Sequence, residues 1–354
     1  MRQSATQYPK VTIGLDLGDR TSQVYELDAQ GRRARETTVG TRPGAIDAYF
    51  GGRPHCRVVM EAGTHSPWVS RRIEALGHEV VVSNPSLVYG KRRRKKRNDR
   101  LDAEFLARQG RADVALLHPI RHRGVRAQQD LELLRARDQL VRARTKLINH
   151  VRGAVKSLGG RLLRCSAEAF PRRASGDLPE EQRPALEPLL EVIADLTGRI
   201  RAFDRGIERL VAESYPEAQR LQQPRGVGPL TALAFILLVE DPTRFQHSRE
   251  VGAYFGLVPR LDASSGSDPQ LRITKAGDEL GRRLLVSAAH YILGPHGPEC
   301  DLRRHGERIA ERGGKNAKKR AVVAVARKLA VLLHRLWVSG ATYEPDWVLS
   351  RRAA

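Results

Sequence analysis

Four acidic residues in the first third of the chain have the types and the spacing of ligands for a hard metal ion. Asp16 and Glu61 each end an apolar segment, whereas Asp99 and Asp102 stand three residues apart at the start of a predicted helix. This spacing places both carboxylates on one helix face. Carboxylate oxygens suit Mg²⁺, and two such ions about 4 Å apart can stabilise the attacking and leaving oxygens of a phosphoryl displacement. The simpler alternative is that Asp16 and Glu61 only end strands and that Asp99 caps a helix.

The segments around these residues predict a mixed α/β region. Short apolar runs bounded by turn residues predict strands, and apolar residues at helical spacing predict helices. The strands are expected at residues 11–18, 21–28, 33–40, 57–61 and 79–83, and the helices near residues 45–50 and 67–76. Three hairpin-linked strands followed by alternating helices and strands is the order of the ribonuclease H-like fold.

A run of seven consecutive cations stands just before the second acidic pair. It comprises Lys91, Arg92, Arg93, Arg94, Lys95, Lys96 and Arg97. Because like charges this dense repel one another unless an anion neutralises them, we expect the run to hold a nucleic-acid backbone beside the metal site. A solvated loop and a localisation signal are the alternatives.

The whole chain is strongly basic. Its 354 residues include 62 Lys and Arg against 40 Asp and Glu, a formal net charge of +22. This excess indicates a polyanionic partner, either nucleic acid or an anionic membrane surface. The longest apolar run, residues 230–239, is too short to span a bilayer, so we expect nucleic acid and no membrane. Three widely separated cysteines fit neither a disulfide framework nor a zinc site, which indicates a reducing cytoplasm.

Two segments in the middle of the chain repeat apolar residues every seven positions. In residues 128–158, apolar pairs recur with arginines between them. In the second segment the expected core positions are Leu186, Ile193, Ile200 and Ile207, together with Leu189, Leu196, Phe203 and Leu210. Two heptad stretches separated by the Pro- and Gly-containing residues 170–184 predict an antiparallel coiled-coil hairpin or a dimerisation element.

The last third of the chain is predicted to be mainly helical and contains three further candidate sites. The turn from Gly226 to Gly228 precedes an apolar helix and resembles a helix-hairpin-helix element, in which backbone amides approach a phosphate closely; a plain tight turn is the alternative. Lys315, Lys318 and Lys319 begin the last helix as a solvated or backbone-contacting face.

The third candidate is a loop with two adjacent hydroxyls, Ser264 and Ser265, before Gly266. Its neighbours could stabilise a phosphate under attack by a serine hydroxyl: Arg260, Arg272, Lys275, Arg282 and Arg283. The alternative is an ordinary loop, because Ser, Gly and Asp are common in turns.

These motifs, taken together and in order, resemble the DEDD-type insertion-sequence transposases, the insertion-sequence-110 family of bridge-RNA-guided recombinases. The resemblance covers nearly the whole chain and rests on GLDLG, VVMEAG, RNDRLDAEFLA, GVGPLTA, GLVPR, SSG and ITKAGDELGRRLL. One departure is that Asp19 stands where many relatives have a basic residue.

The resemblance implies a RuvC-like nuclease domain in which Asp16, Glu61, Asp99 and Asp102 bind Mg²⁺. It also implies a C-terminal transposase domain with Ser265 as the nucleophile that links covalently to DNA, or Ser264 in its place. The implied partners are donor and target DNA, a noncoding guide (bridge) RNA, and further copies of the chain in a dimer or tetramer. The implied location is the bacterial cytoplasm, in association with the nucleoid.

We therefore expect an RNA-guided DNA transposase with a domain order that follows the motifs. The expected parts are a tail (1–9), a RuvC-like domain (10–118), a coiled-coil region (119–218), a serine transposase domain (219–345) and a second tail (346–354). The alternative functions are a metal-dependent junction resolvase or nuclease without a serine intermediate, and a noncatalytic nucleic-acid-binding scaffold. In each case association with nucleic acid should weaken steeply with salt.

Overall fold

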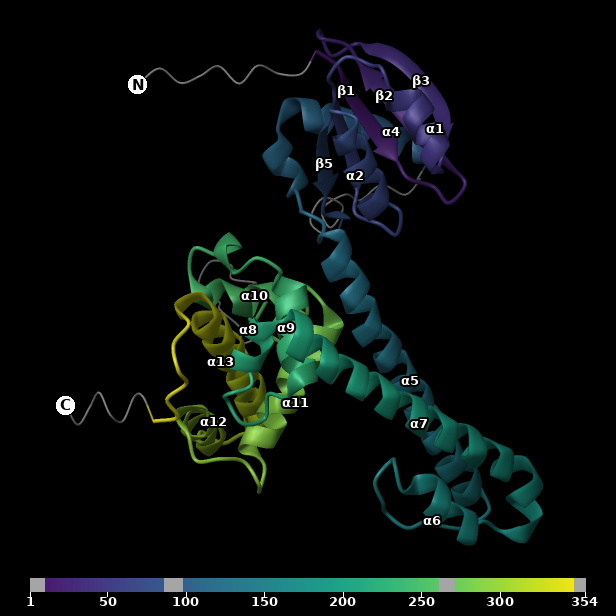
Figure 1. The fold of residues 1–354 in the computed structure, drawn as a ribbon, viewed down its shortest axis with the longest axis vertical. Helices are drawn as coiled ribbons and strands as arrows, with labels where there is room; N and C mark the ends of the chain where they lie inside the picture. The colour runs from purple at the N-terminus through teal and green to yellow at the C-terminus, as the bar shows by residue number, and fades with distance from the viewer. Residues whose placement is uncertain (1–9, 86–97, 261–270, 347–354) are drawn as a thin grey trace, which may run out of the picture. The chain divides into compact units, whose positions relative to one another are not determined.

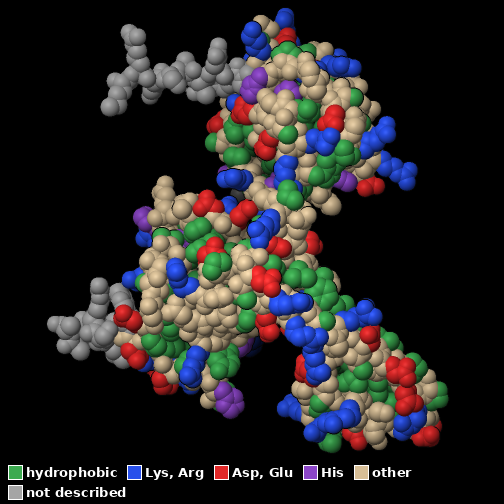
Figure 2. Space-filling model, in the orientation of Figure 1, with side chains coloured by type: hydrophobic (Ala, Val, Ile, Leu, Met, Phe, Trp, Pro, Cys, Tyr) green, Lys and Arg blue, Asp and Glu red, His purple; other side chains and the backbone are tan. Residues whose placement is uncertain are grey.

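The computed structural model describes residues 10–85, 98–260 and 271–346, and they form two compact units divided between Arg123 and Gly124. Lysine and arginine side chains are spread over the surface of both units in the view of Figure 2. None of the helices in the described part of the chain combines the length and the apolar character that crossing a membrane requires.

The first unit contains a five-stranded mixed sheet with the strand order β3-β2-β1-β4-β5. Its strands are β1 (Thr12–Asp16), β2 (Thr21–Leu27), β3 (Arg33–Gly40), β4 (Arg57–Glu61) and β5 (Glu79–Ser83). The first three strands pair antiparallel, whereas β4 is parallel to β1 and β5 is parallel to β4. The predicted α/β region is thus confirmed. β3, β4 and β5 have the expected bounds, and β1 ends two residues early because the chain leaves it to turn into β2.

Helices cover both faces of this sheet (Figure 1). They are α1 (Pro43–Phe50), α2 (Ser66–Ala75), α4 (Asp99–Ala112) and the 3₁₀ turn η1 (Val114–Leu117). α1 and α2 pack against Ile13 and Leu15 of β1 and Val58 and Met60 of β4. Because successive side chains of a strand point to opposite faces, the even-numbered residues of β1 and the odd-numbered residues of β4 face α4 instead.

Two glycines allow α4 to lie unusually close to the sheet. A Cβ at Gly14 of β1 would stand 1.9 Å from the carbonyl oxygen of Ala103 in α4, and one at Gly110 of α4 would stand 2.2 Å from a methyl carbon of Val59 in β4. Arg57 of β4 also donates to the carbonyl of Gly110 at 2.9 Å. Contacts at both ends therefore fix the position of α4 along β1 and β4.

The second unit begins with two long helices that pack antiparallel. Its first part comprises α5 (Val125–Ser157), α6 (Phe170–Gly176), the 3₁₀ turn η2 (Glu180–Gln182) and α7 (Arg183–Ser214). Residue numbers rise along α5 while those of the contacting residues fall along α7: Arg137 contacts Asp204 at 2.6 Å, and Arg144 donates to Thr197 at 3.2 Å. This confirms that two heptad segments form a helical pair.

The buried seam of α7 differs from the predicted one at its second position. Leu186, Ile193, Ile200 and Ile207 are buried as expected, whereas Leu189, Leu196, Phe203 and Leu210 are only half-buried. The second buried row is Leu190, Thr197 and Val211, four residues after Leu186, Ile193 and Ile207 instead of three, and Asp204, four residues after Ile200, is half-buried. The prediction chose the more apolar row, but α5 presents Arg137 and Arg144, whose guanidinium groups require polar partners. A regular coiled coil is not confirmed.

Shorter helices complete the second unit. They are α8 (Pro216–Arg220), α9 (Pro229–Val239), η3 (Pro242–Arg244), η4 (Ser248–Glu250), α10 (Val251–Tyr254), α11 (Glu279–Leu293), α12 (Asp301–Glu311) and α13 (Ala317–Ser339). α9 is buried from Ala232 to Val239, as expected of an apolar helix without a polar face. Leu131 of α5 and Val211 of α7 join the same core, so the base of the helical pair is continuous with the C-terminal helices. The predicted domain boundaries remain predictions.

Candidate functional site

Asp16 and Glu61 end two adjacent parallel strands of the first unit. The register of β1 and β4, continued one step beyond its last pair, sets these two residues side by side. Neighbouring strands are about 4.8 Å apart. Both side chains lie on the α4 face of the sheet, since Gly14 and Val59, two residues before them, approach α4.

The first turn of α4 brings the other two carboxylates to the same edge. Asn98 is the N-cap, and its side chain accepts a hydrogen bond from the backbone N–H of Arg100 at 3.1 Å. Asp99 and Asp102 follow in the first turn, where the partial positive charge of a helix N-terminus favours carboxylates. The contact between Gly14 and Ala103 fixes this turn beside the end of β1.

The four carboxylates interact electrostatically. Burial raises the pKa of Asp16 from its ordinary value of 3.8 to about 7, and the negative charges of Glu61, Asp99 and Asp102 contribute to this rise, in that order of importance. Asp99 is exposed at the surface, whereas Asp16, Glu61 and Asp102 are half-buried. The structure therefore brings together the four acidic residues that the sequence singled out.

This donor set fits a divalent cation. A cation would relieve the repulsion that opposes ionisation of Asp16, and carboxylates are the ligands that Mg²⁺ prefers. Among the described residues, no three acidic, histidine or cysteine side chains already stand in a metal-binding arrangement. A bound ion would thus draw the four carboxylates closer than they stand now.

Sequence reasoning missed a histidine beside this edge. His65, at the start of α2, lies with Nε2 3.5 Å from a carboxylate oxygen of Asp19, and its Nδ1 accepts a hydrogen bond from Trp68 at 3.1 Å. Asp19 follows β1 and His65 follows β4, so the loops after these two strands meet here. The only feature of the sequence that could have indicated this contact is position, since Asp19 stands three residues after Asp16 and His65 stands four residues after Glu61.

The predicted serine nucleophile and the seven-cation run lie outside the described residues. This applies to Ser264 and Ser265 and to Lys91–Arg97. The residues on either side of the serine segment are paired: the backbone N–H of Arg260 donates to the carbonyl of Arg272 at 3.0 Å, and Pro259 forms a β-bridge with Ile273. The side chains of Arg260, Arg272 and Lys275 are exposed.

The two arginines predicted on α11 have protein partners. Arg282 donates to the carbonyl oxygens of Phe255 at 3.2 Å and Ala276 at 3.0 Å, so it fastens the segment before α11. Arg283 forms an ion pair of 2.5 Å with Asp138 of α5. Their role in binding nucleic acid stays a prediction, and the structure gives both a structural role that the sequence did not indicate.

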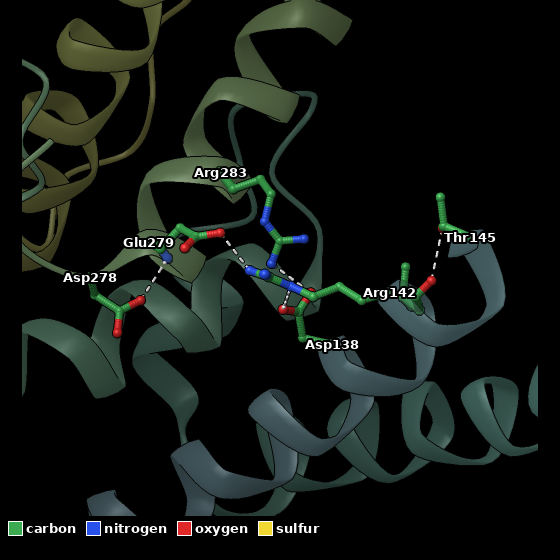
Figure 3. Close-up of polar contacts among 8 residues, drawn as sticks. Asp138, Arg142, Thr145, Asp278, Glu279 and Arg283 are labelled. Atoms are coloured by element: carbon green, nitrogen blue, oxygen red, sulfur yellow. Dashed lines mark hydrogen bonds and ion pairs between the residues drawn. The ribbon is translucent and has the colours of Figure 1, made fainter. Parts of the chain in front are cut away.

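Figure 3 shows that Asp138 joins α5 to the start of α11. It accepts from Arg142 at 2.9 Å as well as from Arg283, and Arg142 also pairs with Glu279 at 2.6 Å. Asp278 caps α11 by accepting from the backbone N–H of Gly281 at 3.0 Å. These contacts fix the N-terminus of α11 on the helical pair.

Asp138→Ala should destabilise the second unit by about 2–3 kcal/mol, because Asp138 is buried and its loss leaves Arg283 without an ion-pair partner and Arg142 with Glu279 alone. Urea unfolding followed by circular dichroism measures this change. Asp195→Ala is the matched control, since Asp195 pairs with Arg199 at the surface and its loss should change stability by less than about 0.5 kcal/mol. Equal effects of the two substitutions would show that the network does not stabilise the unit.

The remaining predicted residues lie at the starts of two helices. Gly226 has φ +97° and lies against α11, where a Cβ would stand 3.0 Å from a ring carbon of Tyr291. A Cβ at Gly228, at the N-terminus of α9, would meet no described atom within 4 Å. α8, before this turn, has only five residues, so the helix-hairpin-helix element is not confirmed. Lys315, Lys318 and Lys319 are exposed around the start of α13.

Comparison with known proteins defines the class of this protein. Residues 13–159 match a family model for DEDD transposases of the IS110 group, described as "Transposase", and residues 218–301 match "Transposase IS116/IS110/IS902 family". The chain is thus an insertion-sequence transposase, a DNA-processing enzyme. It belongs to the IS110 family.

Full-length relatives are similar along most of the chain. The probable family 20 transposase of Pseudomonas aeruginosa is 28% identical over 340 residues, which is 94% of this chain and 98% of the relative. The transposase for insertion sequence element IS1111A of Coxiella burnetii is 30% identical over 94% of this chain and 90% of its own length. The transposase for insertion sequence element IS1328 of Yersinia enterocolitica is 30% identical over 80% of this chain and 85% of its own.

Proposed function

We propose that this transposase cuts and joins DNA strands at the edge of the sheet where Asp16, Glu61, Asp99 and Asp102 meet, in a RuvC-like, ribonuclease H-like domain. The observation that carries the proposal is that the ends of β1 and β4 and the first turn of α4 meet at one edge of the sheet, and the raised pKa of Asp16 supports it. If Asp16 and Glu61 only ended strands and Asp99 only capped a helix, there would be no reason for their carboxylates to lie at the same edge. The strand order, with two parallel strands delivering Asp16 and Glu61 together, supports the same function.

The four carboxylates would hold Mg²⁺, which supplies charge stabilisation for a phosphate under attack and for the leaving oxygen. Asp16 and Glu61 come from a sheet, and Asp99 and Asp102 from a helix fixed by glycine contacts, so the backbone holds the four ligands at one edge and only their side chains need to move to bind the ion. Because burial and neighbouring charges raise the pKa of Asp16, this carboxyl gives up its proton when the cation binds.

We further propose Ser265 as the nucleophile, with Ser264 as the alternative; the support is the resemblance of the SSG segment and its flanks to the family. In this step the serine Oγ forms a bond to phosphorus, the bond from phosphorus to a deoxyribose oxygen breaks, and that oxygen takes up a proton. A DNA hydroxyl then displaces the serine, which restores the enzyme and joins the strands. We propose that the exposed side chains of Arg260 and Arg272, which flank this segment, bind the phosphate.

The proposed partners follow from charge and resemblance. The net charge of +22 suits a protein that contacts several nucleic-acid strands, so we propose a noncoding guide RNA in addition to donor and target DNA. We also propose a homo-oligomer, dimer or tetramer, with the α5–α7 pair contributing to assembly, in the cytoplasm and associated with the nucleoid.

The test combines three variants of the full-length protein with the guide RNA and the ends of its element. Asp102→Ala should lower strand cleavage by at least about a thousand-fold, or about 4 kcal/mol of transition-state stabilisation. Ser265→Ala should abolish the covalent protein–DNA adduct seen on denaturing gels, and Ser264→Ala should leave it. Adduct formation by Ser265→Ala but not by Ser264→Ala would move the nucleophile to Ser264.

The outcome also separates the alternatives. Hydrolytic DNA ends without an adduct, from a protein in which Ser265→Ala is active and Asp102→Ala is inactive, would identify a nuclease instead. Unchanged transposition by a variant that lacks all four carboxylates would identify a scaffold.

A further inference from the structure

The end of the α5–α7 pair farthest from the C-terminal core, here called the tip, has opposite charges on its two sides. Residues 146–173, which run from α5 through the connecting loop into α6, contain seven Lys and Arg and one carboxylate. Residues 177–195, which lead into and along α7, contain six carboxylates and one arginine. In Figure 2 the cations gather on the side of α6 and its preceding loop, and carboxylates gather toward the start of α7.

Six of the seven cations of the tip have no partner within the described part of the chain, and the seventh, Arg152, donates to the carbonyl of Leu163. These six are exposed and form no ion pair or side-chain hydrogen bond with another described residue: Lys146, Lys156, Arg161, Arg164, Arg172 and Arg173. Glu168, the carboxylate in their midst, is paired with Arg144 at 3.3 Å. On α7, by contrast, Arg183 and Arg199 pair with carboxylates of neighbouring turns.

The positive side of the tip also presents two leucines to solvent. Leu158 is 70% exposed and Leu163 is 65% exposed, the highest values among the large apolar side chains of the described residues. The loop that carries them is anchored, because Leu162 is buried in a local core with Phe170 and because Arg152 donates to the carbonyl of Leu163 at 3.3 Å. The leucines are therefore held outward on either side of Arg161.

The length of the helical pair sets the tip apart from the C-terminal core. Leu134 of α5 belongs to the C-terminal core and Val155 belongs to the core of the tip. At 1.5 Å per residue, the helix between them spans about 32 Å. This is close to one turn of duplex DNA, about 34 Å, so the tip and the C-terminal helices can reach the same duplex one turn apart.

We infer that the tip is a separate docking surface for duplex DNA, in which its cations bind backbone phosphates and Leu158 and Leu163 contact sugars and base edges. Cations without internal partners lose little on binding phosphate, whereas the carboxylates along α7 repel DNA and so determine which side docks. Exposed leucines beside phosphate-binding arginines suit a groove, where apolar side chains pack against bases. This inference uses only the DNA-binding activity of the family and depends on neither the metal site nor the serine.

The experiment measures binding of the full-length protein to a fluorescein-labelled 40-base-pair DNA duplex by anisotropy at several KCl concentrations. Arg161→Gln/Arg164→Gln should weaken binding about tenfold or more and reduce the slope of log affinity against log salt by about 1.8, because each lost phosphate contact contributes about 0.9. Leu158→Ser/Leu163→Ser should weaken binding without changing the slope. Arg199→Gln, on the α7 side, is the control and should bind like the wild type.

Three outcomes would overturn the inference. The first is an unchanged salt slope in both Arg161→Gln/Arg164→Gln and the independent pair Arg172→Gln/Arg173→Gln. The second is that the tip variants show a lower oligomeric state than the wild type by light scattering while their DNA binding is unchanged, which would assign the tip to contact with a second copy of the chain. The third is that the arginine substitutions weaken binding to an RNA duplex of the same length more than they weaken binding to the DNA duplex.

Discussion

Replacing Asp16 with asparagine should abolish DNA strand cleavage and, at the same time, stabilise the metal-free protein above pH 7. The first effect follows from the proposed metal site, since an amide cannot replace a charged ligand; we expect a loss of at least about a thousand-fold. The second follows from the environment of the carboxyl, which is half-buried and faces three other carboxylates. A variant that is less active and more stable is typical of a functional residue held under strain.

The pH dependence has a definite sign. The pKa of Asp16 is raised from 3.8 to about 7, so the folded protein holds this proton more tightly than the unfolded chain does. Its stabilising contribution is complete below pH 4 and is lost as the pH rises through 7. A rise of this size would amount to about 4 kcal/mol for a fully buried group, and partial exposure of the carboxyl reduces it to about 1–2 kcal/mol.

Thermal unfolding between pH 5 and pH 8 in the presence of a chelator measures this effect. The difference in stability between Asp16→Asn and the wild type should grow across this range, and Mg²⁺ should raise the unfolding temperature of the wild type more than that of the variant. Asp47→Asn is the control, because its partner Arg72 lowers the pKa of Asp47 and any change falls at acid pH. A constant difference between pH 5 and pH 8 would contradict the electrostatic coupling.

Gly14→Ala should destabilise the first unit by at least about 3 kcal/mol. The new methyl group would stand 1.9 Å from the carbonyl oxygen of Ala103, and the obstacle is helix backbone, which cannot rotate away. α4 must therefore shift, and it carries Asp99 and Asp102. The same substitution should thus lower cleavage even at temperatures where the protein remains folded.

Differential scanning calorimetry is the appropriate measurement, with an expected fall of about 12 °C or more for a unit of this size. Gly44→Ala is the matched control: Gly44 lies in α1, no described atom would stand within 4 Å of its new Cβ, and the change should stabilise by about 0.5–1 kcal/mol. Unfolding temperatures that coincide for the two variants would show that the close approach of α4 is not required.

The strands could be predicted because the information that defines them is local. The apolar run of β4, residues 57–61, and that of β5, residues 79–83, are bounded by turns, and the structure keeps both bounds. The acidic residues were equally visible, since each stands at the end of such an element or at the start of a helix. The pattern could not predict the distance between α4 and the sheet. In the sequence, Gly14 is only a residue that weakens a strand, and its role in letting α4 approach closely becomes visible only when its neighbour Ala103 is known.

In the helical pair, too, the contacts between distant segments could not be predicted from the sequence. Its heptads were visible, but the second buried row of α7 contains Thr197, and the half-buried Asp204 stands in line with it, because these two residues meet Arg144 and Arg137 of α5. A polar residue is acceptable in a seam only when its partner arrives from another helix. Arg283 likewise resembles a free cation until the fold places Asp138 beside it.

The sequence by itself determined the elements, the family and the identity of the four carboxylates, since hydrophobic period and motif order are properties of contiguous residues. Only the tertiary structure decided that these carboxylates share one edge, that Arg282 and Arg283 have protein partners, and that six cations of the tip have none among the described residues. The physical reason is that charge acts through space: whether a carboxylate or a guanidinium is available depends on which groups of distant segments come within a few ångströms of it.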